Sequence, residues 1–382
     1  MKIIFLTACL EAGRDGVGDY TLRLARECLA LGHTCTVIAL HDTFVSHSKE
    51  ENREGLRLIR LSALHPWRTR SARVESLVRD ENPQWLSWQM VAYGYHSKGI
   101  LPSALARLAA EISGTRSHVM LHELWIGLER SAPWRQRAVG WWQRRVLLRW
   151  LASVRPACLH TSNATYRRVL AAAGFSADVL PLFGNVAPVP LGACPRSRLA
   201  LWLPNAGGSS RDSFLIAVTF GTLHPQWETA ATARWLSAAA AAVGRKPALL
   251  AIGRLGQEPS VALARFKAAG MEVGATGEQD AATVSRLLGV ADLGIAPHPW
   301  ALIGKSGAAA AMLEHGLPVL VPRDEWRLRG EIPPGDETAD PLLRRLDGLD
   351  AAQSGAWLAL RRSARAALPA TAGTFIAALA SV

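Results

Sequence analysis

The stretch EAGRDGVGDY, residues 11–20, follows the apolar run MKIIFLTACL and combines glycines with two aspartates. Glycine lets backbone N–H groups approach a ligand closely, and a helix that starts after such a loop favours an anion. The order G-x-x-G-x-G differs from the dinucleotide fingerprint, and no Lys-Ser/Thr pair follows as in a P-loop. We expect a ligand-covering loop, against the alternative of a plain tight turn, at Gly16, Val17 and Gly18.

The two aspartates of this stretch offer acid–base chemistry. Asp15 and Asp19 could position an acceptor hydroxyl, or Asp15 could take its proton as a general base. Asp19 also directly precedes a helix that we expect from about Tyr20 to Leu31. We therefore favour Asp19 as the N-cap of that helix.

A second constellation lies in IAPHPWALIGKSGAAAAMLEHGLPVLVP, residues 295–322. An apolar strand ends in a proline-rich loop, and a helix then starts after Gly304 and Lys305. Ser306 is a suitable N-cap, and Gly307 leaves room at the first turn. The amides at this helix start, together with the Lys305 ammonium, predict a diphosphate receptor. The alternative is a solvated lysine beside a capped helix.

Other candidates lie where strands of the first half end. His122 and Glu123 in LHELW follow one strand, so both are candidate catalytic residues, and for His122 we favour that role over a core histidine. The stretch QMVAYGYHSKG ends another strand and predicts an acceptor-side loop. Its aromatic side chains could instead pack beneath that loop; the residues concerned are Tyr93, Tyr95 and His96.

The elements around these residues alternate between apolar strands and helices. In the first half we expect strands at 35–40, 56–62, 84–91 and 118–125, with a helix around 103–112. The pattern lapses in a Pro-, Gly- and Ser-rich linker at 181–212. It resumes with strands at 214–224, 247–256, 271–279, 292–300 and 317–322, and helices at 227–243, 259–269, up to Leu288, and 305–315.

This alternation predicts two doubly wound, Rossmann-like α/β domains, at 1–190 and 210–382. Open α/β sheets bind ligands at the carboxyl ends of their strands. We therefore expect the site in a cleft where these ends of the two domains face one another.

Composition narrows the class of protein. The chain has 382 residues, 49% of them hydrophobic, and no apolar stretch of the ~20 residues that span a bilayer. We expect a cytoplasmic protein without a signal peptide. The five cysteines contain no C-x-x-C pair, which indicates neither a disulfide framework nor a metal site.

The net charge of +12 comes mostly from arginine, and no nucleic-acid-binding motif is present. Residues 133–156, PWRQRAVGWWQRRVLLRWLASVRP, gather arginines and tryptophans. An amphipathic helix of this kind could lie peripherally on the inner face of an anionic membrane. We favour the alternative, a surface helix whose tryptophans pack inward.

The chain resembles the group-1 (family 4-like) glycosyltransferases of the GT-B fold. The resemblance covers nearly the whole chain and rests on GVGDYTLRLARECLALGHTCTV, MLHELW, LHTSNATYRRVL, FGTLH, and VADLGIAPHPW with MLEHGLPVLVP. It implies an N-terminal acceptor-side domain, a C-terminal nucleotide-sugar domain and a last helix that packs back on the first. It also implies transfer with retention and no metal cofactor, since a cation and a helix dipole stabilise the leaving diphosphate.

The chain departs from this family at its catalytic positions. Ile303 and Ala311 stand where two glutamates are usual, Thr222 replaces an arginine, and HPQWET offers no lysine. By this comparison Lys305, with Arg254, supplies the missing positive charge. Glu314 binds a ribose hydroxyl or only caps a turn. The nucleobase of the donor is expected to lie at Thr276, Gly277 and Glu278.

We therefore predict transfer of a sugar from a nucleoside diphosphate to an acceptor hydroxyl of a glycan, a lipid-linked glycan or a small molecule. Inversion with Asp15 or His122 as the base remains an alternative because the glutamate pair is missing. Two other classes fit the same residues: a nucleotide-sugar epimerase, and a non-catalytic descendant that binds a nucleotide or a partner enzyme.

Overall fold

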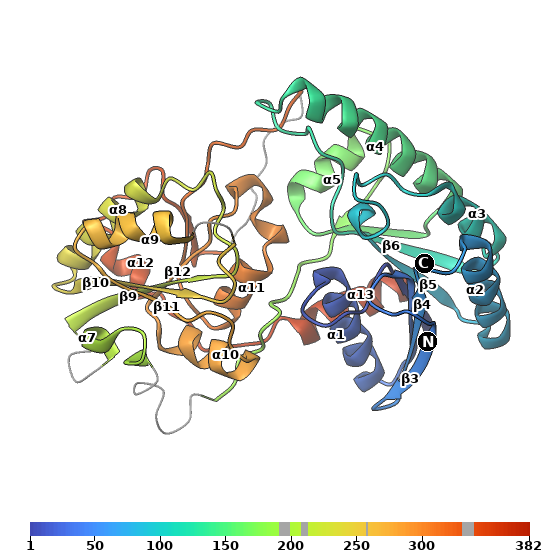
Figure 1. The fold of residues 1–382 in the computed structure, drawn as a ribbon, viewed down its shortest axis with the longest axis horizontal. Coiled ribbons are helices and arrows are strands. Elements are labelled where there is room, and N and C mark those ends of the chain that lie inside the picture. The colour runs from blue at the N-terminus through green and yellow to red at the C-terminus, as the bar shows by residue number, and fades with distance from the viewer. Residues whose placement is uncertain (191–198, 208–212, 257–258, 331–339) are drawn as a thin grey trace. The chain divides into compact units, whose positions relative to one another are not determined.

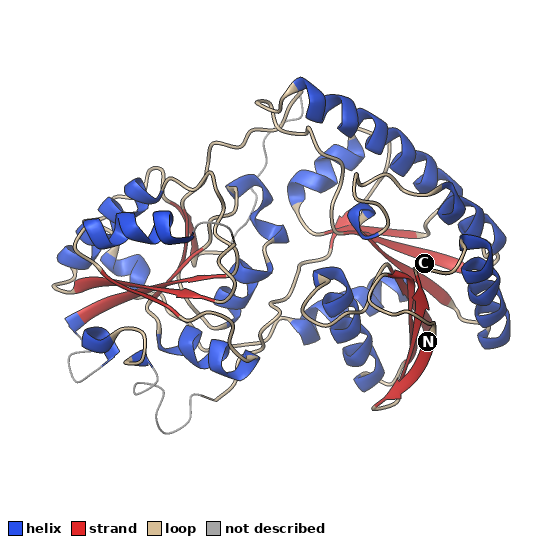
Figure 2. Ribbon diagram, viewed as in Figure 1, coloured by secondary structure: helices blue, strands red, loops and turns tan. Residues whose placement is uncertain are grey.

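The computed structural model describes all residues except 191–198, 208–212, 257–258 and 331–339. It divides into two compact units, each a mainly parallel β-sheet with helices on both faces (Figure 1, Figure 2). Unit 1 comprises Met1–Pro181, Arg327–Gly335 and Leu368–Val382, and unit 2 comprises Leu182–Trp326 and Asp336–Ala367. The predicted fold class, two doubly wound α/β sheets, is confirmed.

The sheet of unit 1 has eight strands in the order β3-β4-β2-β1-β5-β6-β7-β8. The pairs are parallel except for β3 with β4, which form an antiparallel hairpin at the edge. The strands are β1 (Lys2–Thr7), β2 (Thr34–Asp42), β3 (Lys49–Arg53), β4 (Leu56–Ser62), β5 (Trp85–Met90), β6 (Arg116–Leu121), β7 (Cys158–Thr161) and β8 (Asp178–Val179).

Helices from both ends of the chain cover the sheet of unit 1. The final helix packs beside the first, and its Phe375 ring lies 5.8 Å from that of Phe5 on β1. The helices are α1 (Gly16–Ala30), α2 (Trp67–Glu81), the 3-10 turn η1 (Ala92–Gly94), α3 (Ser103–Glu111), α4 (Trp134–Val154), α5 (Ala164–Ala171) and α13 (Leu368–Ala380).

The sheet of unit 2 is parallel throughout its described pairs, in the order β11-β10-β9-β12-β13-β14. Its strands are β9 (Phe214–Phe220), β10 (Lys246–Ile252), β11 (Glu272–Ala275), β12 (Leu293–Ile295), β13 (Val319–Val321) and β14 (Leu343–Arg345). Its helices are α7 (Pro204–Gly207), α8 (Thr229–Ala242), α9 (Pro259–Ala268), α10 (Ala281–Val290), the 3-10 helix η3 (Trp300–Lys305), α11 (Gly307–Glu314) and α12 (Gly355–Leu358).

The apolar runs that predicted buried strands are explained by β9. Ile216 and Val218 lie in one buried cluster, while Leu215 and Ala217 lie in a second cluster. Successive side chains of a strand point to opposite faces, so both faces of this sheet are covered. A strand in such a sheet has no polar face and reads as a continuous apolar run.

The first helix begins earlier than we predicted. Asp15 has extended backbone angles, and its side chain accepts a hydrogen bond from the Val17 N–H at 3.0 Å. Asp15 is therefore the N-cap, and the prediction that Asp19 caps a helix from Tyr20 is wrong. Gly16, Val17 and Gly18 belong to the first helical turn rather than to a loop.

Other boundaries also differ from the sequence prediction. The strands expected at 271–279 and 292–300 are only Glu272–Ala275 and Leu293–Ile295. The first is followed by the polar residues TGEQ, and the second by a loop in which Pro299 forms an isolated bridge with Arg323. β4 matches the strand expected at 56–62, whereas β3, its antiparallel partner, was not predicted. Part of the expected linker, at 191–198 and 208–212, lies outside the described residues.

The strand order fixes where each sheet offers a ligand site. It reverses direction between β1 and β5 in unit 1, and between β9 and β12 in unit 2. Loops at the carboxyl ends of two such strands diverge and leave a crevice between them. The residues after β1, β5, β9 and β12 therefore border these two crevices. Within the described part of the chain, no helix is long and apolar enough to cross a membrane.

Candidate functional site

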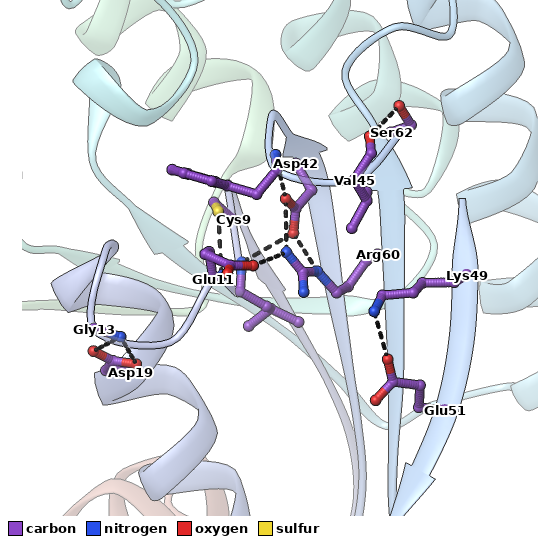
Figure 3. Close-up of polar contacts among 12 residues, drawn as sticks. Cys9, Glu11, Gly13, Asp19, Asp42, Val45, Lys49, Glu51, Arg60 and Ser62 are labelled. Atoms are coloured by element: carbon purple, nitrogen blue, oxygen red, sulfur yellow. Dashed lines mark hydrogen bonds and ion pairs between the residues drawn. The ribbon is translucent and has the colours of Figure 1, made fainter. Parts of the chain in front are cut away.

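The loop after β1 is anchored by one buried ion pair. The Arg60 guanidinium on β4 donates to both carboxylate oxygens of Asp42, at 2.6 and 3.0 Å, and to Glu11 at 2.7 Å (Figure 3). The same Asp42 carboxylate accepts from the Leu10 N–H at 3.2 Å. These contacts hold the pKa of Asp42 below its usual value in spite of its burial, and they fix the start of the loop.

The two glycines at the start of α1 have different surroundings. A Cβ on Gly18 would lie 2.4 Å from the Cys9 carbonyl oxygen, so the helix can pack on the loop only if this residue is glycine. A Cβ on Gly16 would meet no described atom within 4 Å, and its φ is not positive. Gly18 is thus required for the packing of α1 on the preceding loop, whereas a side chain at Gly16 would point into open space.

Asp15 and Asp19 surround this helix start with carboxylates. Burial raises the pKa of Asp15, and hydrogen bonds from the Gly18 and Val17 amides act against that rise. Burial also raises the pKa of Asp19, whose carboxylate accepts from the Gly13 N–H at 3.1 Å (Figure 3). A carboxylate with a raised pKa is better suited to accept a proton from a hydroxyl.

His122 lies directly after β6, as predicted, but its side chain is only 7% exposed. Its Nε2 lies 3.0 Å from Gln89 Oε1, and its ring packs edge-on against Tyr20 with centroids 4.8 Å apart. Burial lowers the pKa of His122 to about 3, so the ring is neutral at neutral pH. Its neighbour Glu123 is half-buried.

The three residues predicted as one acceptor-side element do not act as a group. Tyr95 is buried and belongs to an aromatic cluster, 6.3 Å from both the His41 and the Trp67 rings. Tyr93 is exposed and accepts a hydrogen bond from Gln143 of α4 at 3.1 Å. His96 is exposed and accepts from the Lys98 N–H at 3.1 Å. For Tyr95 the packed alternative is therefore correct.

In unit 2 the start of α11 has the predicted geometry. Ser306 is confirmed as the N-cap, since its hydroxyl accepts from the Ala309 N–H at 3.2 Å. A Cβ on Gly307 would have Asn185 Nδ2 as its nearest neighbour, at 3.8 Å, so the first turn is uncrowded. The first N–H groups of a helix have no intrahelical acceptor and can bind an anion. Gly304 and Lys305 end η3 immediately before this cap.

Three basic residues that the sequence analysis missed lie with Lys305. Burial and the charges of Lys305, His224 and Arg323 lower the pKa of His298 to about 4. These residues follow β9, β12 and β13, so they meet beside the switch point of the sheet. No spacing in the sequence links them, because parallel strands bring together loops that are distant in the chain.

Arg323 is an unusual member of this group. It is 2% exposed, and its guanidinium donates to Glu325 at 2.7 Å and to Gln226 at 2.8 Å. Its Nη1 is buried and has no partner among the described residues. An unsatisfied buried donor costs about 1–3 kcal/mol, and more for a charged group. A ligand anion would remove that cost.

The other predicted donor residues form a separate edge of unit 2. Arg254 is exposed and pairs with Glu278 at 2.5 Å, so its charge is compensated within the fold. Thr276 and Gly277 hold the end of β10, because the Gly253 N–H donates to Gly277 O at 3.1 Å. Thr222 is exposed beside Gly256. The prediction that Arg254 reinforces Lys305 has no support in these contacts.

Glu314 has a partner within the fold. Its buried carboxylate accepts from the Gly184 N–H at 2.5 Å, and Gly184 itself packs on Ala311, where a Cβ would lie 2.5 Å from the helix backbone. The carboxylate thereby fixes the residues that precede Asn185 against α11. This contact favours the structural alternative for Glu314 over a ribose ligand.

Known structures share this fold over the full chain. Sucrose-phosphate synthase from Thermosynechococcus elongatus matches with a TM-score of 0.62 and 13% identity, covering 100% of this chain and 96% of that one. HepE from Anabaena, in complex with UDP, matches with a TM-score of 0.57 and 14% identity, covering 100% of each chain. The catalytic domain of starch synthase IV from Arabidopsis thaliana, bound to ADP and acarbose, matches with a TM-score of 0.58 and 12% identity. The match covers 100% of this chain and 98% of that one.

These likenesses show that the chain has the fold of the GT-B glycosyltransferases. Neither a protein-family model nor a curated protein sequence matches it.

Proposed function

We propose that the protein is a glycosyltransferase that moves a sugar from a nucleoside diphosphate to an acceptor hydroxyl. The observation that carries this proposal is the start of α11, where Lys305 precedes the Ser306 cap and lies, like His224 and Arg323, close enough to His298 to lower its pKa. A diphosphate presents closely spaced negative charges, and cations together with helix amides are its usual partners. The likeness to structures that hold UDP or ADP agrees with this ligand.

In this proposal the basic group serves the leaving diphosphate. Negative charge builds up on that group as its bond to the sugar breaks, and preorganised donors stabilise the transition state more than the ground state. Lys305 and the amides at Gly307 contribute directly. The Arg323 Nη1, buried without a described partner, gains one. No metal cofactor is part of the proposal.

The acceptor side of the proposal rests on Asp15. Its raised pKa and its place beside the open surface of Gly16 suit a group that accepts the hydroxyl proton. His122 is less suited to that role, because a base with a pKa of about 3 holds a proton weakly. Its neutral ring remains able to hydrogen-bond a sugar hydroxyl. We keep retention of the anomeric configuration as the expected outcome and inversion through Asp15 as its alternative.

A nucleotide-sugar screen tests the proposal on the full chain. We expect one nucleoside diphosphate and its sugar ester to raise the melting temperature, since a ligand that binds only the folded state stabilises it. We also expect transfer to an added hydroxyl acceptor. Sugar conversion without an acceptor would identify an epimerase, and binding without any turnover would identify a non-catalytic protein.

We propose further that α4 contacts an anionic membrane surface. Its side chains Trp134, Trp141 and Trp142 are 72%, 57% and 46% exposed, so the inward packing that we favoured holds only for Trp150. Arginines lie over two of these rings, Arg135 at 5.5 Å and Arg145 at 5.7 Å. Exposed indoles with arginines match the boundary between headgroups and acyl chains. Such a contact favours a lipid-linked acceptor.

Vesicle co-sedimentation tests this contact. We expect binding to vesicles rich in phosphatidylglycerol, weaker binding at high salt, and loss of binding in the Trp141→Ser/Trp142→Ser double variant. Phe44→Ser is the matched control, since Phe44 is 54% exposed elsewhere on unit 1. Equal sedimentation of the double variant and the control would overturn the proposal.

A further inference from the structure

A row of buried polar side chains crosses the sheet of unit 1 beneath α13. Strand pairing sets Ser87 of β5 opposite His118 of β6, and His118 opposite Cys158 of β7. His160 lies two residues beyond Cys158 and so shares its face. The Phe375 ring of α13 lies edge-on to the His118 ring, with centroids 5.0 Å apart, and covers this face. Neither the nucleotide nor the acceptor chemistry proposed above uses these side chains.

Three of these residues direct metal-binding atoms toward one point. His118 Nε2 lies 3.0 Å from His160 Nδ1, Cys158 Sγ lies 3.6 Å from the same Nδ1, and the three ligand atoms all lie within 4.8 Å of one another. Around a tetrahedral zinc ion, ligand atoms are separated by about 3.3 Å for two nitrogens and about 3.6 Å for nitrogen and sulfur. The side chains therefore need only small shifts to enclose such an ion.

A hydrogen bond at the other ring nitrogen, Nδ1, also orients the ring of His118. Its Nδ1 lies 2.8 Å from Ser87 Oγ, which accepts a hydrogen bond from Gln89 Nε2 at 2.8 Å. When Nδ1–H donates to the serine, the Nε2 lone pair points toward His160. Metal-binding histidines typically have such a partner on the other ring nitrogen, because it fixes the tautomer and the ring orientation.

Access comes from the side of Cys158. This residue is half-buried and lines a pocket of about 550 Å³ together with Asp178 of β8 and Ser381 after α13. Asp178 pairs with His160 across β7 and β8. The pocket gives an ion a way in from solvent, and a water molecule or the Asp178 carboxylate can complete its coordination.

We propose that His118, His160 and Cys158 form a binding site for a divalent cation of the zinc type. Two imidazoles and a thiolate favour zinc over magnesium or calcium, which prefer oxygen ligands. Cys158 starts β7 and His118 lies early in β6, so the site is near the amino ends of the strands. His122 and the α1 start follow the carboxyl ends. The ion ties β6 to β7 and is independent of the proposed transfer.

Cobalt titration of the full chain, stripped with a chelator, tests this site. Co²⁺ replaces Zn²⁺ in tetrahedral sites and gives a thiolate-to-cobalt absorption band when a cysteine binds it. We expect this band to saturate at one equivalent in the wild type and to disappear in Cys158→Ser. Cys28→Ala, which removes a buried thiol of α1, is the matched control and should keep the band.

Two further readings separate metal binding from a merely structural role. Ser87→Ala should keep the band but weaken Co²⁺ affinity by about 10–100-fold, the usual effect of losing an outer partner. Zn²⁺ alone should raise the melting temperature of the wild type and of Cys28→Ala, but not of Cys158→Ser. Nucleotide binding should be equal in all these variants, so a failure here is distinct from a failure of the proposed transfer.

Absence of the band in the wild type would overturn the proposal, as would a band that persists in Cys158→Ser. Cys158 is half-buried and serine is nearly isosteric with it, so this variant should fold. It decides the outcome even if substitutions at the buried histidines do not fold.

Discussion

The start of α1 in unit 1 and the start of α11 in unit 2 are built on the same plan. Each follows a strand at the switch point of its sheet, and each helix is capped by a side-chain oxygen, from Asp15 and from Ser306. Each has a glycine at its first position: among the described residues, a Cβ on Gly16 would meet no atom within 4 Å, and a Cβ on Gly307 would have Asn185 as its nearest neighbour at 3.8 Å. Backbone geometry alone would assign both helix starts to the same kind of ligand.

Their charges distinguish them. At the start of α1, Asp15 and Asp19 are the carboxylates; the charge of Arg23 acts on Asp19, and the nearby Arg60 is bound by Asp42 and Glu11. An aspartate cap and a second aspartate in the first turn compensate the positive end of the helix dipole within the protein. Around α11 the cap is a neutral serine, and the neighbours are basic. The same helix start therefore suits a hydroxyl in unit 1 and a diphosphate in unit 2.

The largest effect should follow from filling the open space at α1. Gly16→Val introduces a side chain at a helical position with no positive φ, so the ligand-free melting temperature should change little. Turnover should fall about a hundredfold or more if substrate lies against this backbone. Melting and turnover are measured on the same preparation. Full activity of the folded variant would show that no substrate approaches Gly16.

Removing the positive charge of Lys305, beside the start of α11, should weaken the binding of the nucleotide. Lys305→Ala should reduce the affinity for the nucleoside diphosphate by about 1.5–3 kcal/mol, the range for a charge-assisted contact. Calorimetry measures it, and Lys267→Ala, at an exposed lysine of α9, serves as the control. Equal affinity in both variants would remove Lys305 from the site.

The second glycine of α1 should respond in the opposite way from the first. Gly18→Ala forces a Cβ to within 2.4 Å of the Cys9 carbonyl oxygen, so the loop or the helix must move. We expect a loss of about 1–3 kcal/mol in unfolding free energy, as for overpacking. Gly16→Ala should stay near the wild type. Chemical denaturation of both variants measures the difference, and equal stabilities would contradict the assigned roles.

The smallest effect is a proton taken up on binding. His298 is neutral above its pKa of about 4, and a bound diphosphate should raise that pKa because it favours the charged ring. Near pH 5 we therefore expect uptake of a fraction of one proton, and near pH 8 none. Calorimetry of a nucleotide sugar in buffers of different ionisation enthalpy measures it. His298→Asn should abolish the uptake, and no uptake in the wild type would place His298 away from the anion.

Much of the fold could be read from the sequence because buried parallel strands and their helices leave a regular alternation of apolar runs. The helix after Ser306 was predicted from a cap, a lysine and a glycine that are adjacent in the chain. The strand β3 was missed because its residues, Lys49–Arg53, are polar and mostly exposed, so they leave no apolar pattern, although the turn that follows has positive φ at both Glu54 and Gly55.

The candidate site was predicted only where its residues are neighbours in sequence. Lys305 was found, but His224, His298 and Arg323 come from three separate loops that only the strand order brings together. Asp15 and Asp19 were both recognised, yet the wrong one was chosen as the cap, because either residue could precede a helix. The inward turn of Tyr95 depends on its packing with Trp67 and His41, which no local pattern records.

Because α13 belongs to unit 1, the two units differ in when they can complete their folding during synthesis. Phe375 lies against Phe5 and His118, so a helix far along the chain completes a core that β1 begins. During synthesis unit 2 emerges in between and can fold as the chain lengthens. Until α13 has been synthesised, part of the sheet of unit 1 remains uncovered. Contacts between residues so distant in sequence also form slowly. The unit that leaves the ribosome first is the one finished last.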